Sequence, residues 1–141
     1  MKRLTFLLFI TLIFSLLGRV AIASVPEPIN PRESVSFSFE QRLAHAKQLH
    51  AKLKEATPSE RLMFWDKSIE AIKKLAPEER RALGEKFKTQ WKKLSDEQKR
   101  EIKQESRNYI TSLPDSERKE LKRRREYLLE FMTLEEQKHW P

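Results

Sequence analysis

The apolar positions in the second half of the chain return every nineteen residues. Each unit places apolar side chains seven, fifteen and eighteen residues after a common starting position. These offsets lie within about 80° of one another on a helix of 3.6 residues per turn, so they share one face. The positions are Phe64, Leu83, Ile102, Leu121 and Trp140 at offset 7, Ile72, Trp91, Ile110 and Leu129 at offset 15, and Leu75, Leu94, Leu113 and Met132 at offset 18. The pattern predicts a series of amphipathic helices that each bury one stripe.

A helix-start signal recurs in the same register. The starts are Thr57, Ala76, Ser95, Pro114 and Thr133, and each is followed three residues later by Glu60, Glu79, Gln98, Glu117 or Glu136. This spacing suits a capping box, in which the two side chains satisfy backbone N–H groups at the start of a helix. Ala76 has no side chain that caps, and Pro114 occupies the cap position itself. Separate helices, rather than one long rod, are therefore expected.

The repeat length predicts an all-α fold. A nineteen-residue unit holds a helix of roughly 15 residues and a short turn, so we expect neighbouring helices to be antiparallel. One further helix begins near Ser38 and ends near Glu55. The expected architecture is an array or bundle of about four to five short antiparallel helices. The pattern does not decide between a closed bundle and an open array.

The first 23 residues have the pattern of a secretory signal peptide. Lys2 and Arg3 precede an apolar run from Leu4 to Leu17, and small residues stand at Ala21 and Ala23. The alternative is an uncleaved membrane anchor, but the apolar run is 14 residues long against the ~20 that span a bilayer. We therefore expect cleavage near Ala23 and a periplasmic or secreted protein.

Removal of residues 1–23 leaves 118 residues, the size of one domain. The mature part has 26 basic and 21 acidic residues, a net charge of +5. Pro26, Pro28 and Pro31 predict an extended, mobile leader over residues 24–35, and residues 36–141 form the helical-repeat domain.

The chemistry-bearing residues do not form a recognisable catalytic or metal-binding pattern. The chain has no cysteine, which excludes disulfides and thiolate metal sites. His45 and His50 are five residues apart and lie on different faces of a helix. Glycine-rich loops, nucleophile elbows and His-Glu zinc motifs are absent from the sequence. We expect no enzyme activity, no cofactor and no metal.

Two groups of residues are candidates for binding. Three consecutive bulky apolar residues, Met63, Phe64 and Trp65, cannot all point inward on one helix, so one of them is expected to face a partner such as another envelope protein.

The second group is basic and comprises Arg118, Lys119, Lys122, Arg123, Arg124 and Arg125. It suits anionic lipid or polysaccharide at the cell envelope. The alternative is a solvated helix face, because Glu117, Glu120, Glu126 and Glu130 surround the run. The export signal argues against nucleic acid.

The repeats resemble a family of small secreted proteobacterial proteins of unknown function that repeat a Leu-Ser/Thr-Pro-Glu-Glu-Arg phrase with Trp-x-x-Leu before it. The matching segments are Leu75-Ala76-Pro77-Glu78-Glu79-Arg80, Thr57-Pro58-Ser59-Glu60-Arg61 and Trp91-Lys92-Lys93-Leu94. Asp96 and Asp115 replace the proline of the phrase. The resemblance implies an all-helical exported protein and supplies no catalytic residues.

A second resemblance is to periplasmic stress chaperones of the Leu-Thr-x-x-Gln type, carried by Leu94-Ser95-Asp96-Glu97-Gln98. The hypothesis from the sequence is an exported, non-enzymatic protein that binds other proteins or acts like a chaperone through a concave face edged by lysine and arginine. The alternative is an adaptor that binds anionic lipid or polysaccharide through the basic helix. Trp140, at a core offset, is expected to pack on the preceding helix.

Overall fold

The computed structural model describes residues 25–138. The predicted signal peptide and the predicted packing of Trp140 lie outside these residues. The described part is helical and has no strands, which confirms the all-α fold class. Its helices are α2 (Pro31–Ser34), α3 (Phe39–Glu55), α4 (Pro58–Lys73), α5 (Pro77–Lys93), α6 (Asp96–Ser112), α7 (Asp115–Phe131) and α8 (Leu134–Gln137).

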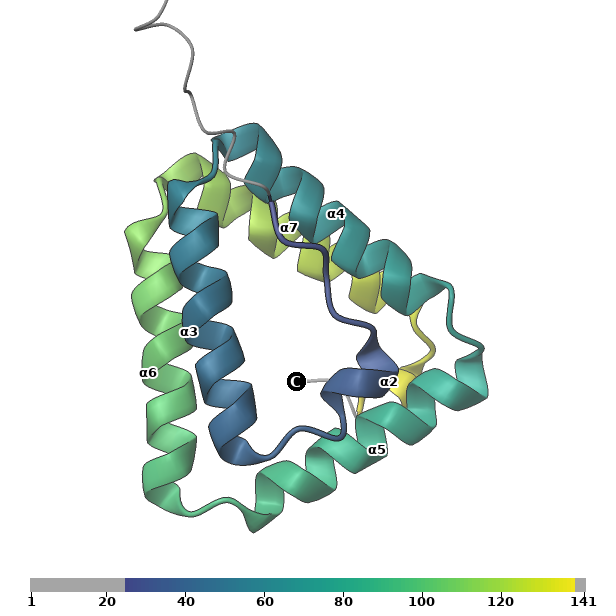
Figure 1. Cartoon of the computed structure of the whole chain (residues 1–141). Coiled ribbons are helices and arrows are strands. Elements are labelled where there is room, and N and C mark those ends of the chain that lie inside the picture. The colour runs from purple at the N-terminus through teal and green to yellow at the C-terminus, as the bar shows by residue number, and fades with distance from the viewer. Residues whose placement is uncertain (1–24, 139–141) are drawn as a thin grey trace, which may run out of the picture.

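The long helices follow the sides of a triangle, and three of them complete one turn of a superhelix (Figure 1). Helices α3, α4 and α5 form a first layer, and α6, α7 and α8 form a second layer. Packing joins α3 to α6, α4 to α7 and α5 to α8. Each helix therefore packs on the helix three units further along the chain.

The expected antiparallel arrangement is wrong, because the packed helices run parallel. Arg61 near the start of α4 pairs with Glu117 near the start of α7, and Lys73 at the end of α4 bonds to Tyr127 towards the end of α7. The joints explain the difference. Ala56 and Thr57, which join α3 to α4, both have extended backbone angles, and such a joint turns the chain through a corner (Figure 1).

The predicted helix starts are confirmed at residue level. Complete capping boxes occur at Ser38, Thr57, Ser95 and Thr133, whereas Ala76 and Pro114 make no side-chain cap hydrogen bond. Ser38 lies nineteen residues before Thr57. Helix α3 is therefore a further unit of the same repeat.

Two clusters of buried residues form the core. One contains Leu53, Phe64, Tyr109 and Leu113, and the other contains Val35, Leu75 and Leu83. Offsets 7 and 18 supply most of these side chains, as predicted. Offset 15 varies between units: Leu53 of α3 is fully buried, whereas Ile110 of α6 is 39% exposed and its neighbour Tyr109 is buried instead. No helix within residues 25–138 is long and apolar enough to cross a membrane.

The segment that we expected to be an extended leader contains a helical turn. Asn30 accepts a hydrogen bond from the Arg32 N–H, and Pro31 occupies the first position of α2, where its missing N–H costs nothing. The segment runs along the inside of the triangle (Figure 1). Val35 is buried in the core at its end.

Candidate functional site

The inner face of the first layer holds a pocket of about 240 Å³. The leader segment and helices α3, α4 and α5 together form its wall. Phe64 and Ile72 belong to the predicted apolar stripe, whereas the other apolar helix residues of the wall lie at other offsets. The lining residues are Glu27, Pro28, Ile29, Pro31, Ser34, His45, Leu49, Phe64, Trp65, Ser68, Ile72 and Phe87.

The leader, residues 25–35 in the described chain, lies against this pocket and is held by ion pairs. Lys67 Nζ on α4 is 2.6 Å from a Glu27 carboxylate oxygen. Arg32 pairs with Glu79 at the start of α5, and this hydrogen-bonded pair holds the pKa of Glu79 below its usual range. The leader is therefore attached to two different helices of the first layer.

Other contacts recognise the leader backbone. Gln90 Nε2 donates to the Val35 carbonyl at 2.5 Å, and Arg42 Nη2 donates to the Ser34 carbonyl at 3.4 Å. Arg42 also donates to the Gln90 side-chain oxygen at 2.8 Å, and its guanidinium lies 4.9 Å from the centre of the Phe87 ring. Because carbonyl groups occur at every residue, these contacts do not require a particular leader side chain.

A histidine shares the pocket. His45 lies with its ring 5.9 Å from that of Phe37. Burial lowers the pKa of His45, and the nearby His50 lowers it further. His45 is therefore neutral at pH 7 and adds no positive charge to the wall.

The three predicted partner-binding residues have different environments. Phe64 is 4% exposed and belongs to the core, and it also forms part of the pocket wall. Trp65 is partly buried and lines the pocket, while Met63 is 54% exposed and does not line it. Phe64 and Trp65 thus belong to the inner-face site, and the assignment of the three residues to a partner surface stays a prediction.

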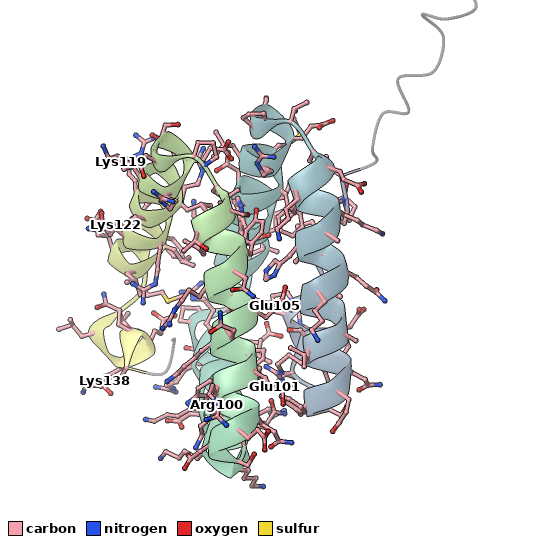
Figure 2. The ribbon with its side chains drawn as sticks, turned by 90° about the vertical axis from the view of Figure 1, so that its left-hand side faces the viewer. Arg100, Glu101, Glu105, Lys119, Lys122 and Lys138 are labelled. Atoms are coloured by element: carbon pink, nitrogen blue, oxygen red, sulfur yellow. The ribbon has the colours of Figure 1, made fainter. Side chains whose placement is uncertain are left out.

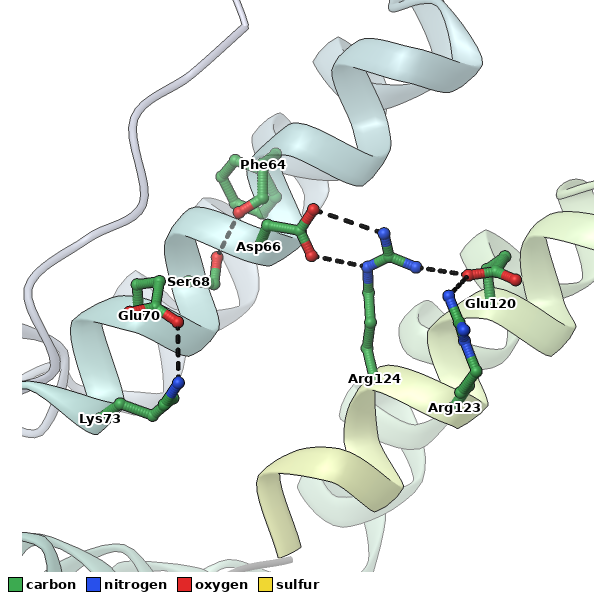
Figure 3. A network of polar contacts seen from close by, with 8 residues as sticks. All are labelled: Phe64, Asp66, Ser68, Glu70, Lys73, Glu120, Arg123 and Arg124. Carbon is green, nitrogen blue, oxygen red and sulfur yellow. Dashed lines mark hydrogen bonds and ion pairs between the residues drawn. The ribbon is translucent and has the colours of Figure 1, made fainter. Parts of the chain in front are cut away.

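The predicted anion-binding run is divided among several tasks. Arg118 donates to the Leu113 carbonyl at 3.2 Å and pairs with Asp115. Arg124 Nε donates across the layers to Asp66 at 2.7 Å, and Arg123 and Arg124 both donate to Glu120 (Figure 3). Lys119, Lys122 and Arg125 are exposed. The six residues therefore do not form one continuous basic surface.

Two buried ion pairs across the layers were not predicted. Arg61 pairs with Glu117 at 2.7 Å, and Arg80 pairs with Glu136 at 2.5 Å. The spacing of Glu117 and Glu136 from the helix starts predicted only a capping role for these carboxylates. A signal was nevertheless present, because an arginine stands four residues after the start of four units: Arg42, Arg61, Arg80 and Arg118.

The same arginines also cap the preceding helices. Arg61 Nη1 donates to the Ala56 carbonyl at 2.6 Å, and Arg80 Nη1 donates to the Leu75 carbonyl at 2.7 Å. These carbonyls lie at helix ends, where intrahelical partners are missing. Each guanidinium thus caps the end of the preceding helix and also links the two layers.

Within residues 25–138, no group of three or more histidine, aspartate or glutamate side chains is arranged to hold a metal ion. The absence of enzyme activity stays a prediction.

The model of a family described as "Protein of unknown function (DUF3106)" matches residues 36–139. The chain belongs to this family. The predicted membership of a family without an assigned function is thereby confirmed. The match begins at Ser36, directly after the leader. Searches of curated proteins and of solved structures return no match, so the function of this DUF3106 protein has to be argued from its own geometry.

Proposed function

We propose that this DUF3106 protein is an exported, non-enzymatic protein that binds extended segments of other proteins on the inner face of its first layer. Such a role matches a chaperone-like or protein-binding component of the cell envelope. The supporting observation is that the inner face already holds a proline-containing segment, the leader. A segment of another protein with similar chemistry has the same groups available to it.

The chemistry of the inner face defines the class of ligand. Leu49, Ile72 and Phe87 provide apolar contact, which is non-directional and accepts varied side chains. Gln90 and Arg42 donate to backbone carbonyls. An unfolded or extended chain offers both apolar side chains and unpaired carbonyls, whereas a folded surface presents few unpaired carbonyls. The leader has to yield part of this surface when such a chain binds.

The alternative function, an adaptor on anionic lipid or polysaccharide, has less support. Arg124 is engaged by Asp66 and Glu120, and Arg123 by Glu120. A lipid surface would have to compete with these ion pairs.

A binding titration tests the proposal. The probe is carboxymethylated α-lactalbumin, a permanently unfolded protein, and the reporter is fluorescence anisotropy with the full mature chain. Ile72→Asp should weaken binding by about fivefold or more, because it places a charge in the apolar pocket. Leu134→Asp, on a side chain that is 76% exposed in α8, is the matched control and should bind like the parent. Equal affinities of the two variants, with both folded by circular dichroism, would refute the proposal.

A further inference from the structure

The second layer has an exposed basic face on the side that corresponds to the covered side of the first layer. In the first layer, α3 packs on α6 and α4 packs on α7, so the second layer covers one side of these two helices. No helix within residues 25–138 covers the corresponding side of α6 and α7. We call this surface the end face, and it comprises Lys99, Arg100, Lys103 and Arg107 of α6 with Arg118, Lys119 and Lys122 of α7. Figure 2 shows Arg100, Lys119 and Lys122 on the side of the second layer that points away from α3.

The repeat register shows that α6 and α7 differ from α3 and α4 at offsets 5 and 8, while offset 4 is basic in both layers. Offsets 4, 5 and 8 carry three bases on α6 and three on α7. At offsets 5 and 8, the first-layer helices α3 and α4 carry Leu43, Ala46, Leu62 and Trp65. These positions are thus apolar in α3 and α4, on which α6 and α7 pack, and basic in α6 and α7; α5 carries Arg81 and Gly84 there.

The contacts between the two layers show how this side of a helix binds the helix that is stacked on it. Arg61 binds Glu117 of the second layer, and His50 Nδ1 lies 2.8 Å from Glu105. Arg118 and Arg107 stand 57 residues after Arg61 and His50, one superhelical turn later. Neither receives a carboxylate from a further helix of the described chain.

The end face has more bases than carboxylates. Three of its bases have a carboxylate nearby on the same helix: Lys99 lies 4.0 Å from Asp96, Arg118 pairs with Asp115, and Lys122 lies 3.8 Å from Glu126. A shallow hollow of about 310 Å³ follows α6 between these bases, and the lining side chains include one carboxylate, that of Asp96. Glu105 lies on the opposite side of α6, where it contacts His50. A ligand that approaches along the superhelix axis therefore meets a net positive charge, to which Arg100, Lys103 and Arg107 contribute most directly.

A second copy of the chain is a poor occupant. Stacked in the same register, its α4 would bring Glu60 to Arg118 of α7, at the register of Glu117 beside Arg61, but its α3 would bring Gln41 and Gln48 to α6. At these α3 positions the amides offer no negative charge to the bases of α6. Charge complementarity requires an acidic partner.

We propose that the end face is a docking surface for an acidic amphipathic helix of another protein, which lies along α6 as a third layer. Glutamates spaced three or four residues apart on one face would meet Lys99, Lys103 and Arg107, which are themselves four residues apart. This interaction is independent of the inner-face site and persists if that site binds nothing.

Two synthetic helical peptides of the same composition test the inference. One carries its glutamates on a single face, and the other distributes them around the helix. Fluorescence anisotropy with the full mature chain should show about tenfold tighter binding of the single-face peptide at low salt. Its affinity should fall steeply once the Debye length shortens to ~8 Å at physiological ionic strength.

Variants locate the contact. Lys103→Glu combined with Arg107→Glu should weaken binding of the single-face peptide by about tenfold or more. Lys86→Glu combined with Lys93→Glu, which changes the net charge equally on exposed positions of α5, should change it by less than about twofold. Equal binding of the two peptides, or equal losses in the two double variants, would overturn the inference. Tighter binding to vesicles containing anionic phospholipid than to the peptide would also overturn it and assign the face to lipid.

Discussion

Arg61 on α4 donates from Nε and Nη2 to the two carboxylate oxygens of Glu117 on α7, at 2.7 and 2.8 Å. The two residues are 56 positions apart and belong to units one superhelical turn apart. Arg80 and Glu136 repeat the relationship with the same separation. These pairs connect the layers at equivalent corners, so we expect the stability of the superhelix to depend on them.

Loss of one partner in this pair should be costly. Arg61 and Glu117 side chains are 10% and 8% exposed, and Glu117→Ala leaves a buried guanidinium without its counter-charge. We expect a loss of about 3 to 5 kcal/mol in the free energy of unfolding, measured in urea. Arg123→Ala, at a side chain that is 72% exposed, should cost less than about 1 kcal/mol. Similar losses in both variants would show that the layers are not joined through Arg61 and Glu117.

Acid should weaken the stack. Hydrogen bonds from Arg61 hold the pKa of Glu117 below its usual range. Burial raises the pKa of Glu136, but hydrogen bonds from Arg80 and Thr133 outweigh that effect and leave it lowered. Because the folded carboxylates take up protons less readily than the unfolded ones, their stabilisation is present above the ordinary carboxyl pKa of 4.5 and is lost as pH falls through the folded values.

The corresponding measurement is the urea midpoint at several pH values. The parent should lose stability between about pH 5 and pH 3. Glu117→Gln combined with Glu136→Gln should be less stable near pH 7 and show a shallower decline. The control is Glu101→Gln, an exposed position at which the decline should match that of the parent. A decline in the double variant as steep as in the parent would exclude these two carboxylates as its source.

Leu53 should be among the most sensitive apolar positions. It has 0% exposure in the core cluster that joins α3, α4 and α6, and Leu53→Ala should cost about 2 to 5 kcal/mol through lost burial and a cavity. Leu134→Ala makes the same chemical change at 76% exposure and should stay within about 0.5 kcal/mol of the parent. Thermal unfolding followed by circular dichroism distinguishes the two, and equal melting midpoints would place Leu53 outside the core.

The missing cap of α5 offers a gain in stability. Ala76 has the extended backbone of an N-cap but makes no side-chain hydrogen bond. Ala76→Ser should complete the cap with the Glu79 N–H and raise the free energy of unfolding by about 1 kcal/mol. Ala82→Ser, within the exposed surface of the same helix, should be neutral or slightly destabilising. No gain from Ala76→Ser would indicate that the serine does not reach the first helical turn.

The sequence predicted the local structure well because local structure has local causes. Cap residues and their partners three positions later specified the helix starts, and the apolar period specified Phe64, Leu83 and Leu113 as core. The repeat period alone did not specify which helices pack together. Antiparallel neighbours and stacked triangular layers both satisfy a nineteen-residue unit, and the choice depends on the extended joints at the corners.

The inner-face site was less accessible to prediction. Three prolines indicated an extended leader, but nothing local to them indicates that Val35 enters the core or that Gln90 binds its carbonyl. The roles of Arg61 and Arg80 could not be predicted either. A charged residue on a helix is usually exposed, and the burial of these two arginines depends on carboxylates 56 residues away. Both features arise from contacts distant in sequence.

Site-specific photo-crosslinking tests the central claim, binding of extended protein segments on the inner face, most directly. A photoreactive residue is placed in the full mature chain either at Ile72, which lines the pocket, or at Met63, which is 54% exposed outside it. Each protein is irradiated with carboxymethylated α-lactalbumin, and the products are quantified by mass spectrometry. If extended segments bind on the inner face, Ile72 should give a crosslinked product that unlabelled unfolded protein competes away, and Met63 should give little product. Equal yields from the two positions, or a product from Met63 alone, would contradict it.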